Sequence, residues 1–204
     1  MHLCCEMQYP LTLQFKFISV STRLKLIDAA GQLISLSKKK KFRFKEHVEV
    51  YQDEKQTQLL ANIHADKVID WSARYNFTDA NETLTLGAVG RKGMRSMWKA
   101  TYEVFGPQGD QVTYTIEEEN PFAKFLDAFL GEIPVLGIIA TLLINPKYVV
   151  KRAGSEELVL RLTKKPAFFE GKFTIDKLAD IPADEEFALL MSLQMVTLLE
   201  RARG

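Results

Sequence analysis

Residues 38–45 hold the densest group of charged side chains in this sequence, and they could bind anions. Six cations are interleaved there with two phenylalanines: Lys38, Lys39, Lys40, Lys41, Arg43 and Lys45. On a strand, Phe42 and Phe44 would share one face, and Lys41, Arg43 and Lys45 would project from the other. Each cation near an anionic membrane contributes about 1 kcal/mol of binding. The stretch predicts a docking surface for anionic phospholipid or another phosphate-bearing partner; the alternative is a solvated edge strand that lysines protect from aggregation.

A second basic group follows later in the chain, and we expect it to converge with the first on one surface. It consists of Arg91, Lys92 and Arg95. The whole chain is nearly neutral, with 27 basic against 26 acidic side chains, so attraction to phosphate depends on such local clusters. No recognition helix is evident, which makes nucleic acid a weaker candidate partner.

Catalytic and metal-binding patterns are not found in the sequence. His2, His47 and His64 have no zinc-ligand spacing and no nucleophile motif around them. Three glycines spaced from residue 87 to residue 93 resemble a phosphate loop, but no Lys-Ser or Lys-Thr pair follows, so a hairpin turn is the better interpretation. Asp127 and Glu132 fit helix-surface and turn roles. The sequence therefore predicts a noncatalytic protein without a metal site or cofactor.

Cysteine usage points to a reducing compartment. The two cysteines, Cys4 and Cys5, are adjacent and are poorly placed to pair with each other. The N-terminus shows no basic-then-apolar signal segment, and residues 1–9 are expected to form a flexible tail. We expect a cytoplasmic protein, with peripheral contact to a membrane if the basic surface binds lipid.

Alternating polar and apolar residues separated by turn sequences dominate residues 11–119 and return after residue 146. This period of two is typical of antiparallel strands joined by hairpins. The predicted strands cover residues 11–19, 23–28, 32–37, 42–51, 57–65, 68–77, 82–86, 97–105, 112–118, 147–151, 157–163 and 172–175. About twelve strands are too many for a small open sheet and favour closure into a barrel.

Residues 121–146 interrupt this pattern with apolar side chains at helical spacing. Gly131 and Pro134 divide the stretch into two short helices, which predicts an inserted helical hairpin. Each half is too short to cross a bilayer. The hairpin either caps the barrel or contacts a membrane or protein partner, and the contact candidates are Phe122, Phe125, Phe129, Ile133, Leu136 and Ile139.

Residues 187–199 read FALLMSLQMVTLL and are apolar on every side of a helix. A surface helix would show a polar face, so this one must be surrounded by the rest of the protein. Acidic residues 184–186 precede it and Arg201 and Arg203 follow it, as the helix dipole favours. The run falls short of the roughly 20 residues of a membrane span. We predict one α+β domain over residues 1–204, a mainly β barrel closed around a central helix at residues 183–203.

These segments, in this order, resemble the tubby-like superfamily, within it the group related to phospholipid scramblases and LURP-one proteins. The resemblance rests on RLKLIDAAGQLI, MWKATYEVFGPQGDQVTYTIEEEN, YVVKR, LVLRLTKKPAFFEGKFTI and the apolar C-terminal helix, and it covers residues 11–203. It implies a closed barrel of about twelve strands threaded by that helix. The superfamily includes phosphoinositide-binding domains and proteins named for lipid scrambling, so fold does not fix function.

Three functions follow as hypotheses. The first is a noncatalytic module that docks anionic phospholipid or another phosphate-bearing partner. The second is a structural or protein-interaction scaffold that uses the apolar hairpin. The third, a lipid scramblase or enzyme, is disfavoured because residues 176–186 lack the carboxylate spacing and the glycine of a calcium loop, and because no full membrane span is evident.

Overall fold

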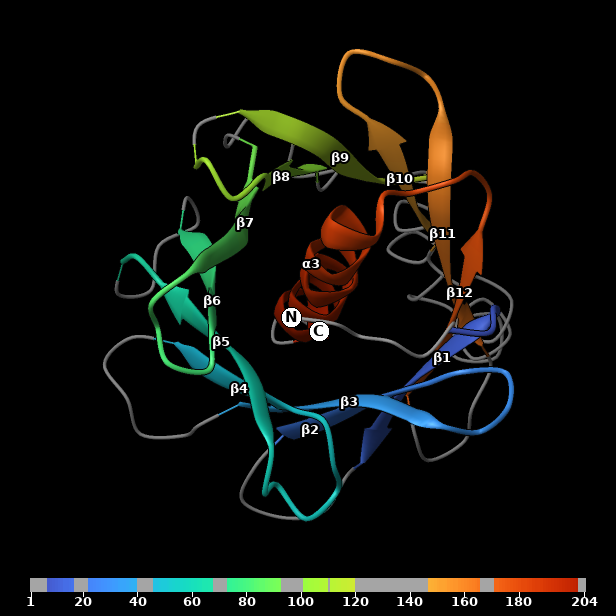
Figure 1. The fold of residues 1–204 in the computed structure, drawn as a ribbon. Coiled ribbons are helices and arrows are strands. Elements are labelled where there is room, and N and C mark those ends of the chain that lie inside the picture. The colour runs from blue at the N-terminus through green and yellow to red at the C-terminus, as the bar shows by residue number, and fades with distance from the viewer. Residues whose placement is uncertain are drawn as a thin grey trace, which may run out of the picture.

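Twelve strands and one helix make up the described part of this computed structural model, which covers residues 7–16, 22–39, 46–67, 73–92, 101–109, 111–119, 147–165 and 171–201 (Figure 1). The strands are β1 (Leu11–Lys16), β2 (Thr22–Ile27), β3 (Leu33–Lys39), β4 (His47–Tyr51), β5 (Leu59–Ala65), β6 (Arg74–Asp79), β7 (Thr85–Arg91), β8 (Thr101–Phe105), β9 (Val112–Glu118), β10 (Lys147–Arg152), β11 (Leu158–Lys165) and β12 (Lys172–Lys177). The helix is α3 (Ala183–Arg201). The predicted hairpin at residues 121–146 lies outside the described residues.

The strands form a closed barrel in which each strand pairs with its sequence neighbours. All neighbouring pairs are antiparallel. The first and last strands close the ring, with Leu11 opposite Ile175 and Leu13 opposite Phe173. The predicted closed barrel of about twelve strands is therefore confirmed.

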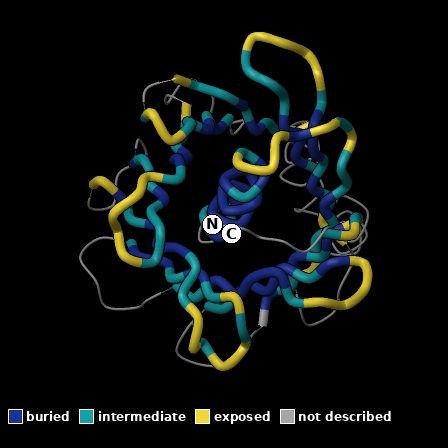
Figure 2. Tube along the Cα trace, in the orientation of Figure 1, coloured by how far each residue is buried: buried dark blue, intermediate teal, exposed yellow. Residues whose placement is uncertain are grey.

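Helix α3 runs through the centre of the barrel, as the apolar run predicted (Figure 1). Leu189, Met191, Leu193, Met195 and Val196 are all fully buried. Buried strand residues belong to the same core cluster. Figure 2 shows the strands as mainly buried or intermediate and the turns as exposed. Among the described residues, no helix is long and apolar enough to cross a membrane.

The polar residues of α3 have internal partners. Gln194 lies 1% exposed, and its Oε1 accepts a hydrogen bond of 2.7 Å from the Ser37 hydroxyl of β3. Its Nε2 donates to the Ser35 hydroxyl at 3.3 Å. Ser192 and Thr197 donate to backbone carbonyls one turn earlier in the helix. Because an unsatisfied buried polar group is costly, the Gln194 contacts favour one rotation of the helix inside the barrel.

Two glycines of β7 correct the prediction of a hairpin turn at residues 87–93. Gly87 and Gly90 lie within the strand. Gly87 has φ +142°, and a Cβ there would come within 2.7 Å of the Phe105 carbonyl oxygen and 3.5 Å of Ala188 on the helix. A Cβ at Gly90 would meet Arg74 and Phe105 at 3.8 Å, an ordinary contact distance. Close packing therefore requires glycine at residue 87.

Three tyrosines outside the helix hold its two ends by hydrogen bonds to glutamates. At its start, the Tyr114 hydroxyl donates to Glu185 and the Tyr9 hydroxyl donates to Glu186 at 2.8 Å. At its finish, Tyr102 donates to Glu200 at 2.6 Å. Burial, reinforced by these carboxylates, raises the pKa of Tyr9 and of Tyr114. The acidic helix start thus has specific partners beyond the helix dipole.

Residues 7–9 differ from the flexible tail expected for residues 1–9. Met7 and Tyr9 pack against the core, and the Gln8 carbonyl accepts a hydrogen bond of 2.8 Å from Ala29 N–H. The chain therefore joins the barrel before β1 begins.

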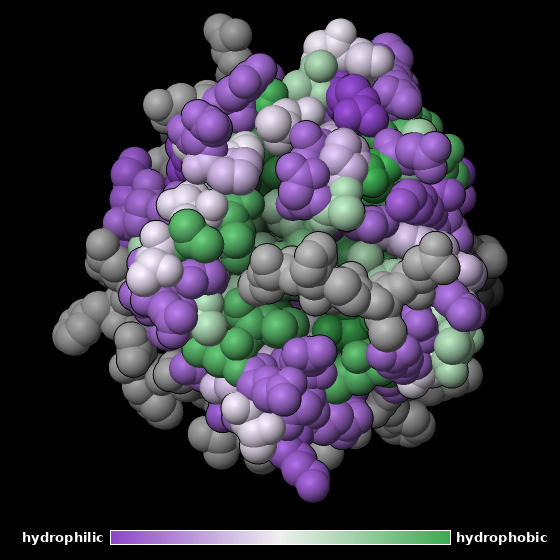
Figure 3. All heavy atoms as spheres, viewed as in Figure 1, coloured by the Kyte–Doolittle hydropathy of each residue, from purple (hydrophilic) through white to green (hydrophobic). Residues whose placement is uncertain are grey.

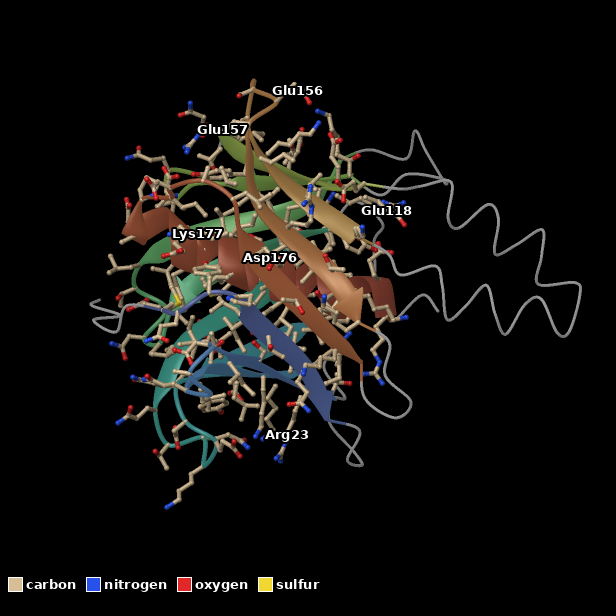
Figure 4. The ribbon with its side chains drawn as sticks, turned by 90° about the vertical axis from the view of Figure 1, so that its right-hand side faces the viewer. Arg23, Glu118, Glu156, Glu157, Asp176 and Lys177 are labelled. Atoms are coloured by element: carbon tan, nitrogen blue, oxygen red, sulfur yellow. The ribbon has the colours of Figure 1, made fainter. Side chains whose placement is uncertain are left out.

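Strand direction defines two ends of the barrel. We call the entry end the one at which α3 begins; it carries the turns at residues 28–32, 52–58, 79–84, 106–111, 153–157 and 178–182. We call the far end the one at which α3 finishes. Lys177 and Glu118 lie towards opposite ends in the side view (Figure 4).

Candidate docking surface

Four cations lie on the outer barrel wall over neighbouring strands, and we name them the cationic belt. They are Arg23 of β2, Lys38 of β3, Lys165 of β11 and Lys172 of β12. These strands are neighbours in the order β11, β12, β1, β2, β3. Arg23 lies directly opposite Lys38, and Lys165 lies directly opposite Lys172. Closure of the barrel through β1 therefore joins two pairs of cations into one surface.

The belt residues point outward because their strand neighbours point inward. Leu24 and Leu26 of β2 are buried in the core, which places Arg23 on the opposite face. Leu162 and Ile175 are also buried in the core, and Lys165 and Lys172, each three residues away along the strand, lie on the opposite face. Figure 4 shows the Arg23 side chain directed away from α3.

No belt cation forms an ion pair within the described part of the chain, although Lys38 lies directly opposite Glu49 of β4. Lys38 donates to the neutral Gln56 amide oxygen at 2.8 Å. Lys165 and Lys172 are exposed, and no ion pair joins either of them, or Arg23, to another described residue. Like charges placed directly opposite each other repel. An external anion would relieve this repulsion.

Lys25 lies on the same wall, but a carboxylate neutralises its charge. It is 7% exposed, and its ammonium forms an ion pair with Glu54 of the turn at residues 52–58. Its charge is thus balanced internally, and we exclude it from the belt.

The predicted basic residues differ in position and in their partners. Lys38 belongs to the belt, whereas Lys39 forms an ion pair with Glu46. Lys92 pairs with Glu103 at 3.0 Å. Arg91 and Lys92 lie on or just after β7, which β4, β5 and β6 separate from β3, so the barrel does not place them beside the belt.

Most of the predicted contact residues cannot be placed. Those outside the described residues are Lys40, Lys41, Arg43, Lys45, Arg95, Phe122, Phe125, Phe129, Ile133, Leu136 and Ile139. They remain predictions. Residues 40–45 connect β3 to β4 and thus follow directly from the belt strand in sequence.

Sequence reasoning missed Arg23, Lys165 and Lys172 as members of a common surface. The sequence does show Lys164-Lys165 followed by Lys172 across a short connection. Nothing in it reveals that this hairpin packs beside β1 and β2, because that neighbourhood arises from closure of the barrel.

Two histidines that showed no motif lie stacked on the outer wall. The His47 and His64 rings have centroids 4.2 Å apart. His47 Nε2 lies 3.1 Å from Asn62 Oδ1, and His64 Nε2 lies 3.2 Å from Glu82 Oε1. Across the described ranges, no three His, Cys, Asp or Glu side chains are grouped to hold a metal ion. The two histidines therefore form a stacked side-chain contact between β4 and β5.

Comparison with known proteins adds no relative to this description. No family model matches the sequence, and no curated protein matches it. The barrel geometry and the belt are therefore the observations on which a function must be argued.

Proposed function

We propose that this protein is a noncatalytic binding module that docks on anionic phospholipid surfaces through the cationic belt. The observation that carries the proposal is the continuity of Arg23, Lys38, Lys165 and Lys172 over neighbouring strands, with two lysines facing each other and exposed. Phosphate groups in the headgroup layer would supply the missing counter-charge.

The expected binding is weak and reversible. About 1 kcal/mol for each cation near an anionic surface gives about 4 kcal/mol for the belt. Since 1.4 kcal/mol corresponds to a factor of ten, the belt accounts for roughly a thousandfold preference for anionic over neutral lipid. Salt screens such exposed charges, so the preference falls as ionic strength rises.

A membrane fits this surface better than nucleic acid does. Helices enter the major groove to read bases, and α3, the helix of the described residues, is enclosed by the barrel. Lysines on a rigid outer wall suit a diffuse layer of phosphates. The proposal includes a cytoplasmic location at the membrane periphery, where the inner leaflet is anionic. It also includes membership of the tubby-like superfamily, which the closed barrel around an apolar C-terminal helix supports.

Vesicle sedimentation tests the proposal. We expect the protein to sediment with vesicles that contain phosphatidylserine and to stay in the supernatant with phosphatidylcholine alone. Lys172→Glu removes one attraction and adds one repulsion, about 2 kcal/mol in total, and should weaken binding roughly 30-fold. Lys55→Glu is the matched control, because Lys55 is an exposed lysine of an entry-end turn.

Two results would overturn the proposal. One is equal recovery with neutral and anionic vesicles at low salt. The other is binding to a short RNA duplex without binding to phosphatidylserine vesicles, which would assign the belt to nucleic acid.

A further inference from the structure

Three lysines and two threonines lie together on the outer face of β10, β11 and β12, and we name them the lysine–threonine patch. They are Lys147, Thr163, Lys165, Lys172 and Thr174. Thr163 lies directly opposite Lys147 on one side and Thr174 on the other. Lys165 lies directly opposite Lys172. The patch therefore contains the two belt lysines of β11 and β12 and adds two hydroxyl groups and a third ammonium group to them.

The patch faces outward because the residues next to its members point into the core. Tyr148, Leu162 and Ile175 are buried in the core cluster, and each is adjacent in sequence to a patch residue. Figure 4 faces this wall and shows the neighbouring Asp176 on it. Hydrophilic side chains are frequent around the outer edge of the barrel in the end view, with apolar ones towards the centre (Figure 3). The wall thus offers polar groups to a ligand.

The polar groups of the patch have no partner within the described part of the chain. Lys165 and Lys172 are exposed, and the other three side chains are half-buried. No ion pair joins any of the three lysines to another described residue. Because like charges directly opposite each other repel, a doubly charged anion between Lys165 and Lys172 would replace a repulsion by two attractions.

The patch has the size of one phosphate group. Residues directly opposite each other in an antiparallel pair have Cα atoms about 5 Å apart, and every second residue of a strand lies about 7 Å further along. The two threonines and the two exposed lysines thus frame an area of about 5 by 7 Å. A phosphate above this area can accept hydrogen bonds of about 3 Å from both hydroxyl and ammonium donors.

The surroundings favour a single phosphate. Asp176 lies two residues beyond Thr174 on the same face of β12, and it forms no ion pair with another described residue. Arg161 lies directly opposite Asp176, and its guanidinium pairs with Glu119 at 3.1 Å. Beyond the threonines the wall therefore carries one more carboxylate than cation. A second phosphate at that position would meet charge of its own sign.

We propose that the lysine–threonine patch binds the phosphate monoester headgroup of phosphatidic acid. This inference rests on the proposed function and names the headgroup that the docking module prefers. A phosphate monoester carries about 1.5 to 2 negative charges at pH 7 and has three strong acceptor oxygens. The phosphate diester of phosphatidylserine carries a single charge and has fewer oxygens free to accept. Arg23 and Lys38, on the same wall, attract the surrounding anionic lipids.

Sedimentation with two kinds of vesicle tests the site. One kind contains phosphatidylcholine and phosphatidic acid, and the other contains phosphatidylcholine and phosphatidylserine. Both are mixed to the same surface potential, so that charge alone does not distinguish them. We expect the protein to bind the phosphatidic acid vesicles about tenfold more tightly at pH 7, the effect of one additional charge-assisted hydrogen bond. Glycerol 3-phosphate at the same phosphate concentration should not displace the protein, because the soluble ester lacks the surrounding lipids.

A double variant without the two hydroxyl groups assigns the preference to the patch. Thr163→Val with Thr174→Val keeps every charge, and valine has the shape of threonine and suits a strand. The variant should bind both kinds of vesicle equally, with its affinity for phosphatidylserine unchanged. Thr115→Val is the matched control, because Thr115 is a half-buried threonine on the outer face of β9, outside the patch. This control should keep the preference.

The opposing results have distinct meanings. Equal affinity of the parent protein for both kinds of vesicle would overturn the phosphate site and leave the proposed function standing. A preference that survives in the double variant would refute its assignment to the patch. Displacement by glycerol 3-phosphate would assign the patch to a soluble phosphate ester and overturn the lipid headgroup. Absence of binding to either kind of vesicle would overturn the proposed function and this inference together.

Discussion

Leu193 lies in the middle of α3, where the barrel surrounds it and its side chain is fully buried. Replacing it with lysine would place an ammonium group among buried apolar side chains of the core cluster. The nearest change of comparable chemistry on the surface is Leu84→Lys, because Leu84 is 63% exposed. The pair separates the effect of burial from the effect of adding a charge.

The magnitude follows from the cost of keeping a lysine in an apolar interior. A fully buried lysine loses its proton, with a pKa lowered by about 3 to 5 units. At about 1.4 kcal/mol per unit, the cost is about 4 to 7 kcal/mol. Domains of this size have total stabilities of about 5 to 15 kcal/mol, so Leu193→Lys removes most or all of the free energy of unfolding.

Urea unfolding followed by far-ultraviolet circular dichroism measures this loss. Leu193→Ala gives a graded version, for which about 3 to 5 kcal/mol is expected from the lost packing and the cavity. Leu84→Lys should change the free energy of unfolding by less than about 0.5 kcal/mol. A folded Leu193→Lys variant with a normal midpoint would refute the enclosure of this helix by the barrel.

Three further changes test other contacts. Gln194→Met leaves two buried serine hydroxyls without their partner and should cost about 1 to 3 kcal/mol in urea unfolding, and replacing both serines by alanine as well should recover most of it. Gly87→Ala should destabilise by about 1 to 3 kcal/mol through its positive φ and its approach to a β8 carbonyl, whereas Gly109→Ala, with positive φ and open space, should cost less. The pKa of Asp53 is lowered in the folded protein, so the folding stability that this carboxylate contributes is complete above the unfolded pKa near 4 and is lost as the pH falls below it. The melting temperature of the Asp53→Asn variant should therefore fall less steeply than that of the parent protein between about pH 5 and pH 3.

Local sequence patterns identified the strands well because their causes are local. The alternation in β6, with Tyr75 and Phe77 buried between partly exposed neighbours, is readable without knowing what lies beside it. Gly87 of β7 was misassigned to a turn because the groups that require a glycine there, the Phe105 carbonyl and Ala188, are distant in the sequence. Glycine spacing alone does not distinguish a turn from close packing.

The candidate surface was predicted only in part for a similar reason. Lys38 was identified from its neighbours in the chain, but Lys39 is neutralised by Glu46 across the β3–β4 pair. Arg23, Lys165 and Lys172 come from segments about 140 residues apart in the sequence. Their common position depends on which strand closes the ring.

The amino-acid sequence by itself determined the element types, the closure of many short strands and the burial of the C-terminal helix. Residues 187–199 are apolar on every side of a helix, so any folded state must surround them. The rest of the sequence supplies antiparallel strands joined by short turns, which can close around the helix. Only the tertiary structure decided which cations have a carboxylate partner and which do not. Ion pairs with Glu54, Glu46 and Glu103 neutralised Lys25, Lys39 and Lys92, while closure of β1 on β12 brought Arg23 and Lys172 onto one wall. Electrostatic interactions depend on distance in space, which the order of residues along the chain does not give.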